Sequence, residues 1–210
     1  MTTTRTLPLA TLLAATLASA FAPAFAPAYA QDSGSWLVRG RALYLDSANK
    51  DSTPLALSVN NKTFPEVDIT YFFTPNLAAE LVLTYPQKHD IRSAGNTIGS
   101  LKHLPPVLTL QYHFPSAGVR PYVGLGLNYT HFSSVSFAPA VVTALGPSIQ
   151  KNSTGLAFNI GADVPIGGGW LLNFDLKKVK LDTDVSSRGT QVGTFKVDPT
   201  LFSVGVGTRF

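Results

Sequence analysis

The sequence predicts an eight-stranded antiparallel transmembrane β-barrel of the bacterial outer membrane, and three observations lead to this fold class. The 210-residue chain is 45% hydrophobic but only 13% charged, against roughly 25% charged residues in a usual soluble domain. Beyond the N-terminus it has no run of about 18 apolar residues, which excludes a helical membrane protein. Apolar residues instead recur at every second position, and short connections alternate with long ones, as in outer-membrane barrels.

Residues 1–30 have the layout of a secretory signal peptide. Arg5 is the only charge, the stretch 7–21 is apolar, and Ala28-Tyr29-Ala30 is a small-residue cleavage site. The prolines in this segment and the cleavage site argue against a transmembrane anchor. We therefore expect residues 31–210 to form one exported barrel domain. The absence of Cys excludes a disulfide scaffold and any thiolate metal site or Cys nucleophile.

The period-2 alternation predicts eight strands, at residues 36–45, 64–74, 76–85, 99–114, 119–132, 153–165, 169–181 and 195–210. Tight turns are expected at 74–76, 115–118 and 165–169. Long polar or mixed loops are expected at 46–63, 86–98, 133–152 and 182–194. An even number of strands closes the sheet, so that no strand edge is left unpaired in lipid.

The last predicted strand has the clearest pattern. Phe202, Val204 and Val206 share one face with the terminal Phe210, while Ser203 and Arg209 lie on the other. An aromatic end after such alternation resembles the signature by which the barrel-assembly machinery recognises its substrates; the alternative is an edge strand of a soluble sandwich. Aromatic residues near strand ends are expected to form the interfacial girdles, namely Trp36, Tyr44, Phe73, Tyr85, Phe114, Tyr129, Trp170 and Phe210.

The inward positions of so narrow a barrel either fill its lumen or hold one small ligand. Toward the periplasmic end, the alternation places a polar plug of both signs: Arg39, Arg41, Glu80, Arg120, Asp163, Asp175, Lys177 and Arg209. Toward the outer end it places an apolar set: Leu43, Leu45, Val82, Val179, Leu181 and Leu201. Small inward residues such as Gly124 and Gly161 are expected to leave room between them. A packed structural core and an apolar pocket open to the outside both fit this pattern.

Two features of the predicted loops bear on function. Pro86, Pro105 and Pro106 lie at the outer ends of the third and fourth strands, where proline cannot donate to the ladder. We expect a local gap in the wall through which an apolar solute leaves sideways, although strands above the bilayer need no regular pairing. Residues 137–145 are too apolar for an ordinary exposed loop. They are expected to form a short helix that caps the mouth or rests on the outer leaflet.

Other chemistry is poorly supported. His131-Phe132-Ser133 has the His-x-Ser spacing of outer-membrane lipid A deacylases, but a serine hydrolase also needs an acid to orient its His, and no acid is suitably placed. We therefore expect no enzyme. His89, Asp90 and His103 flank one loop without a recognisable metal-ligand spacing, so no metal or cofactor is expected. Sparse charges and export argue against nucleic acid.

Several segments together resemble one family. They are Trp36-Leu37-Val38-Arg39, Tyr71-Phe72-Phe73-Thr74-Pro75-Asn76-Leu77-Ala78-Ala79-Glu80-Leu81, Pro86-Gln87-Lys88-His89-Asp90-Ile91, Leu101-Lys102-His103-Leu104-Pro105-Pro106, Gln111-Tyr112-His113-Phe114, Arg120-Pro121-Tyr122-Val123-Gly124-Leu125-Gly126-Leu127-Asn128-Tyr129, Asp198-Pro199 and the terminal Phe210. Over essentially the whole mature chain they resemble the OmpW family of small outer-membrane barrels, which includes the AlkL-type alkane-uptake proteins. One local difference is the alanine-rich third loop.

The resemblance implies an eight-stranded barrel with an apolar lumen, passive entry of small hydrophobic molecules and lateral exit into the membrane. It carries no catalytic residues, and some members serve as receptors for bacteriocins or phage. We therefore expect a passive uptake barrel in the outer membrane of a Gram-negative cell, surrounded by lipid and lipopolysaccharide. The alternative is a structural or interaction barrel with a filled lumen, whose long loops act as a receptor surface.

Overall fold

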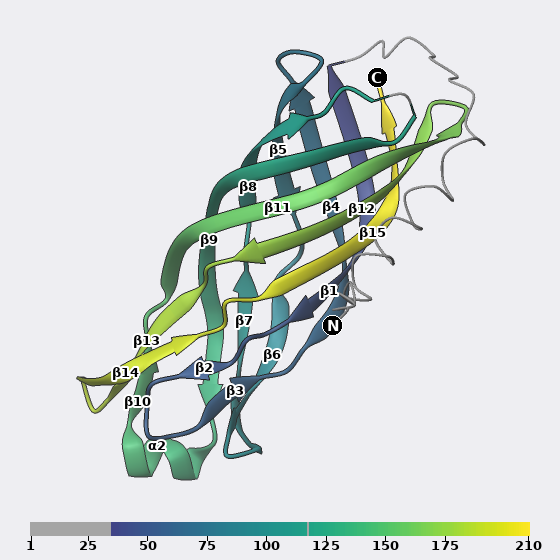
Figure 1. The fold of residues 1–210 in the computed structure, drawn as a ribbon. Helices are drawn as coiled ribbons and strands as arrows, with labels where there is room; N and C mark the ends of the chain where they lie inside the picture. Colours follow the sequence, from purple (N-terminus) through teal and green to yellow (C-terminus); the bar gives the residue numbers. More distant parts are fainter. Residues whose placement is uncertain (1–34, 117) are drawn as a thin grey trace, which may run out of the picture.

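The computed structural model describes residues 35–116 and 118–210, so the predicted signal peptide lies outside the described residues. Its centre is a closed, eight-stranded antiparallel barrel (Figure 1), as the alternation predicts. In chain order the wall strands are β1 (Trp36–Asp46), β4 (Lys62–Phe72), β5 (Leu77–Leu83), β8 (Val107–His113), β9 (Arg120–Phe137), β11 (Asn152–Gly167), β12 (Trp170–Val179) and β15 (Thr200–Arg209). Each pairs with the next, and β15 pairs with β1. No helix between residues 35 and 116 or between 118 and 210 is long and apolar enough to cross a membrane.

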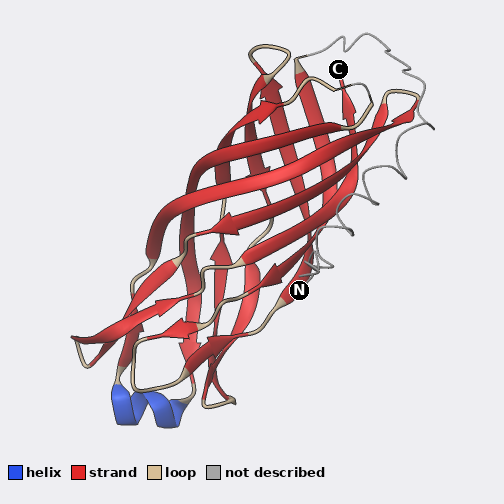
Figure 2. Cartoon of the chain, in the orientation of Figure 1, coloured by secondary structure: helices blue, strands red, loops and turns tan. Residues whose placement is uncertain are grey.

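One end of the barrel carries the short connections β4–β5, β8–β9 and β11–β12 (Figure 2). The two ends of the wall meet there. The backbone N–H of Trp36 donates to the carbonyl of Phe210 at 3.1 Å, and the N–H of Phe210 donates back at 2.9 Å. Short turns and strand termini belong to the periplasmic side of an outer-membrane barrel. The opposite end, with helix α2 (Pro139–Leu145), therefore faces outward.

The outer end is more regular than expected. The segments predicted to be loops contain short strands: β2 (Lys50–Asp51), β3 (Leu57–Val59), β6 (Gln87–Ser93), the start of β7 (Asn96–Leu104), β10 (Pro147–Ile149), β13 (Asp182–Ser187) and β14 (Thr190–Lys196). The prediction of long loops was wrong here, because none of these short strands has more than two buried apolar residues, too few to show a strand pattern in the sequence. With Phe132 of β9 and the neighbouring Leu181 and Val197, the buried apolar residues of these strands form an outer apolar cluster: Leu57, Val59, Ile91, Leu101, Phe132, Leu181, Val185, Phe195 and Val197. The barrel wall thus continues beyond the membrane.

Residues 139–145 form the short helix expected in the third external loop. Pro139 opens it, which suits proline because the first turn needs no amide donor, and Gly146 ends it with a positive φ of 50°. No helix residue is fully buried. Val141 and Leu145 nevertheless face the outer apolar cluster, so one side of the helix covers the outer mouth of the barrel.

The outward face of the wall is apolar between two rings of aromatic residues. Leu125 and Leu156 are each 60% exposed, a condition that suits contact with lipid rather than water. The outer ring contains Tyr44, Tyr85 and Tyr129, and the periplasmic ring contains Trp36, Phe73, Phe114, Trp170 and Phe210, all of them exposed. The membrane-spanning part of the barrel lies between these rings, and strands β6 and β7 lie beyond the outer ring.

Candidate functional site

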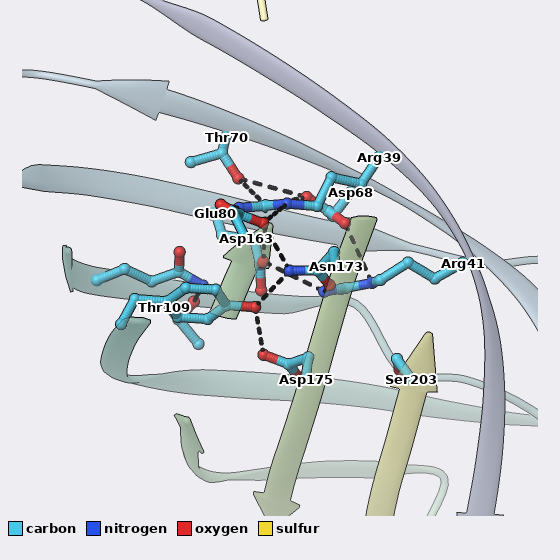
Figure 3. A network of polar contacts seen from close by, with 12 residues as sticks. Arg39, Arg41, Asp68, Thr70, Glu80, Thr109, Asp163, Asn173, Asp175 and Ser203 are labelled. Atoms are coloured by element: carbon cyan, nitrogen blue, oxygen red, sulfur yellow. Dashed lines mark hydrogen bonds and ion pairs between the residues drawn. The ribbon is translucent and has the colours of Figure 1, made fainter. Parts of the chain in front are cut away.

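We call the periplasmic end of the barrel lower and the outer end upper, although Figure 1 draws the outer end, with α2, at the bottom. The lower lumen is filled by interlinked charged side chains (Figure 3). At its centre Arg39 of β1 is fully buried. Its Nε and Nη2 donate to the two carboxylate oxygens of Asp163 at 3.0 and 2.7 Å. Its Nη1 donates to Asp68 at 2.7 Å and to Thr70 at 3.0 Å. Such two-pronged pairing is the strong, directional form of the arginine–carboxylate interaction, and it ties β1 to β4 and β11 across the bore.

Two further cations complete this layer. The Nε of Arg41 lies 2.6 Å from Glu66 Oε1, and Lys177 Nζ donates to Glu80 Oε1 at 2.9 Å. Lys177 Nζ also lies 3.7 Å from Asp175 Oδ1. All of these side chains are almost completely shielded from solvent. Burying so many charges is favourable only when each has an opposite charge and hydrogen bonds at hand.

Neutral side chains add further hydrogen bonds to the carboxylates. The Tyr122 hydroxyl donates to Asp175 Oδ2 at 2.9 Å, and Asn159 donates to the same oxygen at 2.8 Å. Asn173 donates to Asp163 Oδ1 at 2.8 Å, and Ser203 donates to Glu66 Oε1 at 2.8 Å. We call this whole set the charged network: Arg39, Arg41, Glu66, Asp68, Thr70, Glu80, Tyr122, Asn159, Asp163, Asn173, Asp175, Lys177 and Ser203.

The charged network contains six of the eight residues of the predicted plug. The other two, Arg120 and Arg209, lie half-buried at the periplasmic rim. Arg120 sits opposite Asp163 in the β9–β11 ladder, and the guanidinium of Arg209 lies 3.9 Å from the centre of the Phe72 ring. With these two arginines counted, five cations face five carboxylates. The lumen is therefore balanced in charge.

The sequence interpretation missed two acids and misjudged the glycines. Glu66 and Asp68 belong to the inward series Phe64, Glu66, Asp68, Thr70, Phe72 of β4, a period-2 pattern that was available in the sequence. The expected room beside Gly124 and Gly161 is absent. A Cβ on Gly124 would lie 2.2 Å from Asn159 Oδ1, and one on Gly161 would lie 2.3 Å from the Tyr122 ring. These glycines make way for side chains of the charged network instead of leaving a void.

Above the charged network lies an apolar cavity, which we call the upper pocket. The space between its lining atoms is about 450 Å³ when open solvent is counted. All six residues of the predicted apolar set line it, together with Phe64, Glu66, Thr84, His103, Pro105, Val107, Lys177 and Pro199. Glu66 and Lys177 belong to the charged network and form the floor. Nearer the outside is the loop pocket, a space of about 530 Å³ with open solvent counted, lined by part of the outer apolar cluster and by helix α2.

The wall beside the upper pocket is interrupted where the sequence places three prolines. The β5–β8 ladder ends at the pair Val82–Val107, and the β6–β7 ladder begins at the pair Gln87–His103. Between them, residues 83–86 and 104–106 have no partners in each other's segment. We call this interruption the lateral gap. Pro86 is exposed, whereas Pro105 and Pro106 are half-buried.

Another proline, Pro199, interrupts the wall beside the same pocket, but there the neighbouring segments remain joined by hydrogen bonds. Next to Pro199, the N–H of Val197 donates to the carbonyl of Leu181 at 2.9 Å. The N–H of Leu181 donates to Asp198 Oδ1 at 3.0 Å, and that of Val179 donates to the carbonyl of Pro199 at 3.1 Å. Proline alone therefore does not open the wall. The lateral gap is distinctive because such cross-links are missing between its two described segments.

No catalytic arrangement is evident around the His-x-Ser pair. His131 is exposed at the outer ring, and its Nδ1 lies 2.7 Å from the side-chain oxygen of Asn152, an amide, where a serine hydrolase has an acid. Over residues 35–116 and 118–210, no group of three or more His, Cys, Asp or Glu side chains could hold a metal ion.

Comparisons with known proteins agree with this architecture. The model of the OmpW family matches residues 32–210. The chain belongs to the OmpW family. Outer membrane protein W of Vibrio cholerae is 33% identical over 200 residues, covering 86% of this chain and 91% of that protein. Outer-membrane protein y4mB of Sinorhizobium fredii is 38% identical over 186 residues, covering 83% and 80%.

Two solved structures and one further relative are also similar to this chain. The crystal structure of OprG from Pseudomonas aeruginosa matches with a TM-score of 0.74 and 29% identity over 84% of this chain and 96% of that one. The solid-state NMR structure of AlkL in lipid bilayers matches with a TM-score of 0.66 and 25% identity over 90% and 94%. A dibenzothiophene metabolism operon protein, PahQ of Pseudomonas aeruginosa, is 30% identical over 68% of this chain and 69% of that protein. The chain is thus an outer-membrane barrel protein, and its family and fold are not those of an enzyme family.

Proposed function

We propose that this barrel mediates the passive uptake of small hydrophobic molecules across the outer membrane. The solute enters the upper pocket from the outside and leaves sideways through the lateral gap into the membrane. One observation carries the proposal: Pro105 belongs both to the lining of the upper pocket and to the lateral gap. The apolar cavity and the interruption of the wall are therefore adjacent.

The free energies of the two routes out of the upper pocket favour the lateral one. Each methylene group that leaves water for an apolar cavity contributes about 0.8 kcal/mol, so capture needs no polar recognition. Movement along the axis would have to separate the ion pairs of Glu66, Glu80 and Lys177 below the pocket, and breaking one buried pair costs roughly 3–5 kcal/mol. The lateral gap requires no such separation.

Two of the relatives support the same function. The dibenzothiophene operon protein is named for the metabolism of a fused-ring, sulfur-containing aromatic compound. AlkL, whose structure matches at 25% identity, gives its name to the AlkL-type alkane-uptake proteins of the family that the sequence resembles. Lipid and lipopolysaccharide would surround the wall and receive the solute. The exposed terminal Phe210, hydrogen-bonded to Trp36, supports recognition of this chain by the barrel-assembly machinery.

The proposal is tested by uptake of an apolar dye whose fluorescence rises when it enters the cell envelope. Val82→Asp places a charge in the upper pocket and should slow the dye about tenfold. Val142→Asp makes the same change on the exposed side of α2, where Val142 is 51% exposed, and should have no effect. Assembly of each variant is checked by its heat-dependent migration on gels.

The lateral gap is tested by the double variant Pro105→Thr, Pro106→Thr, which restores two backbone donors and should slow uptake. Pro165→Thr, at an exposed site near the periplasmic turn, is the matched control. Unchanged uptake by assembled Val82→Asp barrels would overturn the proposal. It would favour the alternative of a structural barrel whose external segments act as a receptor surface for phage or bacteriocins.

A further inference from the structure

Three polar side chains lie directly above the upper pocket, where its surroundings are otherwise apolar. Gln87 and His89 of β6 and His103 of β7 are 0%, 1% and 4% exposed. Gln87 and His103 face each other as the first pair of the β6–β7 ladder, and the two imidazole rings stack with their centres 4.6 Å apart. We call these three residues the histidine layer. It borders the lateral gap, because Gln87 follows Pro86 and His103 lines the upper pocket together with Pro105.

The histidine layer has polar atoms without partners. Gln87 Oε1, His89 Nε2 and His103 Nε2 are buried and make no hydrogen bond to any described residue. Buried polar atoms are nearly always paired in native proteins, by protein or by a bound molecule. Three orphaned atoms at one level of the lumen, next to an apolar cavity and an opening in its wall, therefore indicate that another molecule completes their hydrogen bonds.

The existing contacts settle what kind of group fits. His89 Nδ1 lies 3.0 Å from the backbone carbonyl of Asn60. A carbonyl only accepts, so Nδ1 carries the proton and the Nε2 of the neutral ring is an acceptor. Gln87 Nε2 donates to the carbonyl of Tyr85 at 3.0 Å, which leaves Oε1 as a second acceptor. The missing partner of these two atoms is therefore a hydrogen-bond donor.

The charge of that donor follows from its surroundings. Burial lowers the pKa of both imidazoles, that of His103 to about 3, and the nearby Lys62 adds to the effect. Both rings are thus neutral at neutral pH and do not attract a carboxylate. Burial and Lys62 also oppose a cationic donor. A neutral hydroxyl group satisfies the acceptors without introducing a charge.

We infer that the histidine layer binds the hydroxyl group of an apolar alcohol or phenol whose hydrocarbon part occupies the upper pocket. The inference rests on the proposed uptake function, since it names a solute class for the same cavity. Hydrocarbons carrying one hydroxyl group would be held at the lateral gap, whereas the corresponding alkanes find no polar partner there. Burial of the hydrocarbon part in the upper pocket gives the solute its affinity. The hydrogen bonds of the histidine layer make the site prefer alcohols and phenols to alkanes.

The test is nitrogen NMR on the barrel in lipid bilayers, labelled at histidine and titrated with 1-octanol or n-octane. The chain has four histidines, so His113 and His131 serve as internal controls for effects of solute in the bilayer. Octanol should shift the Nε2 signals of His89 and His103 saturably, and octane should leave them in place. Equal responses to both solutes, or none to octanol, would overturn the inference and leave water as the occupant.

A pair of variants sharpens the test. Gln87→Leu removes one acceptor but keeps both rings, and should weaken octanol binding about threefold to tenfold. Gln191→Leu, at an exposed site on β14, should leave the affinity unchanged. The dye-uptake assay separates the two proposals. Normal dye uptake without octanol binding refutes only the hydroxyl site, whereas octanol binding without pocket-dependent dye uptake refutes only the uptake function.

Discussion

The charged network and the histidine layer are both buried and polar, yet they differ in how completely their atoms are paired. In the charged network, carboxylate oxygens that lack a hydrogen bond, such as Asp68 Oδ2 and Glu80 Oε2, still have a guanidinium nitrogen within 3.1 to 3.7 Å. In the histidine layer the orphaned atoms have neither hydrogen bond nor described counter-charge. Ion pairs across a polar region hold a fold together, whereas buried polar atoms that face no opposite charge beside a cavity are suited to binding.

The largest expected effect is on stability, from the charged network. Arg39→Met removes the partner of Asp68 and Asp163 and leaves buried carboxylates unpaired. We expect the free energy of unfolding, measured by urea titration in phospholipid vesicles, to fall by about 3–5 kcal/mol. Arg209→Met, at the half-buried rim, should cost clearly less. Dye uptake per assembled barrel should stay unchanged, and a loss of uptake without loss of stability would contradict the structural role of the network.

A smaller effect is expected from overfilling the lower lumen. In Gly161→Ala the new Cβ would lie 2.3 Å from the Tyr122 ring, so the ring and its bond to Asp175 must shift. The same urea titration should show a loss of about 1–3 kcal/mol. Gly40→Ala is the matched control, because a Cβ at Gly40 meets nothing within 4 Å. Equal stability of the two variants would mean that the lower lumen is loosely packed.

The histidine layer should make the free energy of unfolding depend on pH. Burial, with His89 and Lys62 nearby, lowers the pKa of His103 from its ordinary 6.5 to about 3. Below pH 6.5, His103 therefore binds a proton in the unfolded chain but not in the folded barrel. The free energy of unfolding falls as the pH drops below 6.5. Between pH 7 and pH 5 the loss from His103 should be about 2 kcal/mol. In His103→Asn this part of the pH dependence should vanish, and an identical pH profile for variant and parent would refute the depressed pKa.

Much of the barrel could be predicted from the sequence because lipid imposes a strict rule. Residues such as Leu125 and Leu127 must face outward, so the period-2 pattern fixes both the strands and the inward set. The apolar residues that line the upper pocket followed from the same parity, which left open whether they pack together or border a cavity. Beyond the membrane that constraint ends, and short strands such as β3 and β13 carry too few inward apolar residues to be distinguished from loops.

The sequence could not supply distances between strands far apart in the chain. Arg39 and Asp163 are 124 positions apart, yet form the two-pronged pair at the centre of the lumen. The same holds for the histidine layer, where the spacing of His89 and His103 suggested a chance cluster. Only the register of β6 against β7 shows that the rings stack and that their Nε2 atoms lack partners.

The seam between β1 and β15 constrains how this protein is made. Leu37 pairs with Arg209 and Trp36 with Phe210, a separation of roughly 170 residues that makes closure a slow, non-local event. Every other ladder of the wall can form from segments that are neighbours in the chain. The cylinder therefore remains an open sheet with two bare edges until residues 200–210 arrive. Two bare strand edges can pair with other chains, so the protein is most prone to aggregation before this final strand is in place.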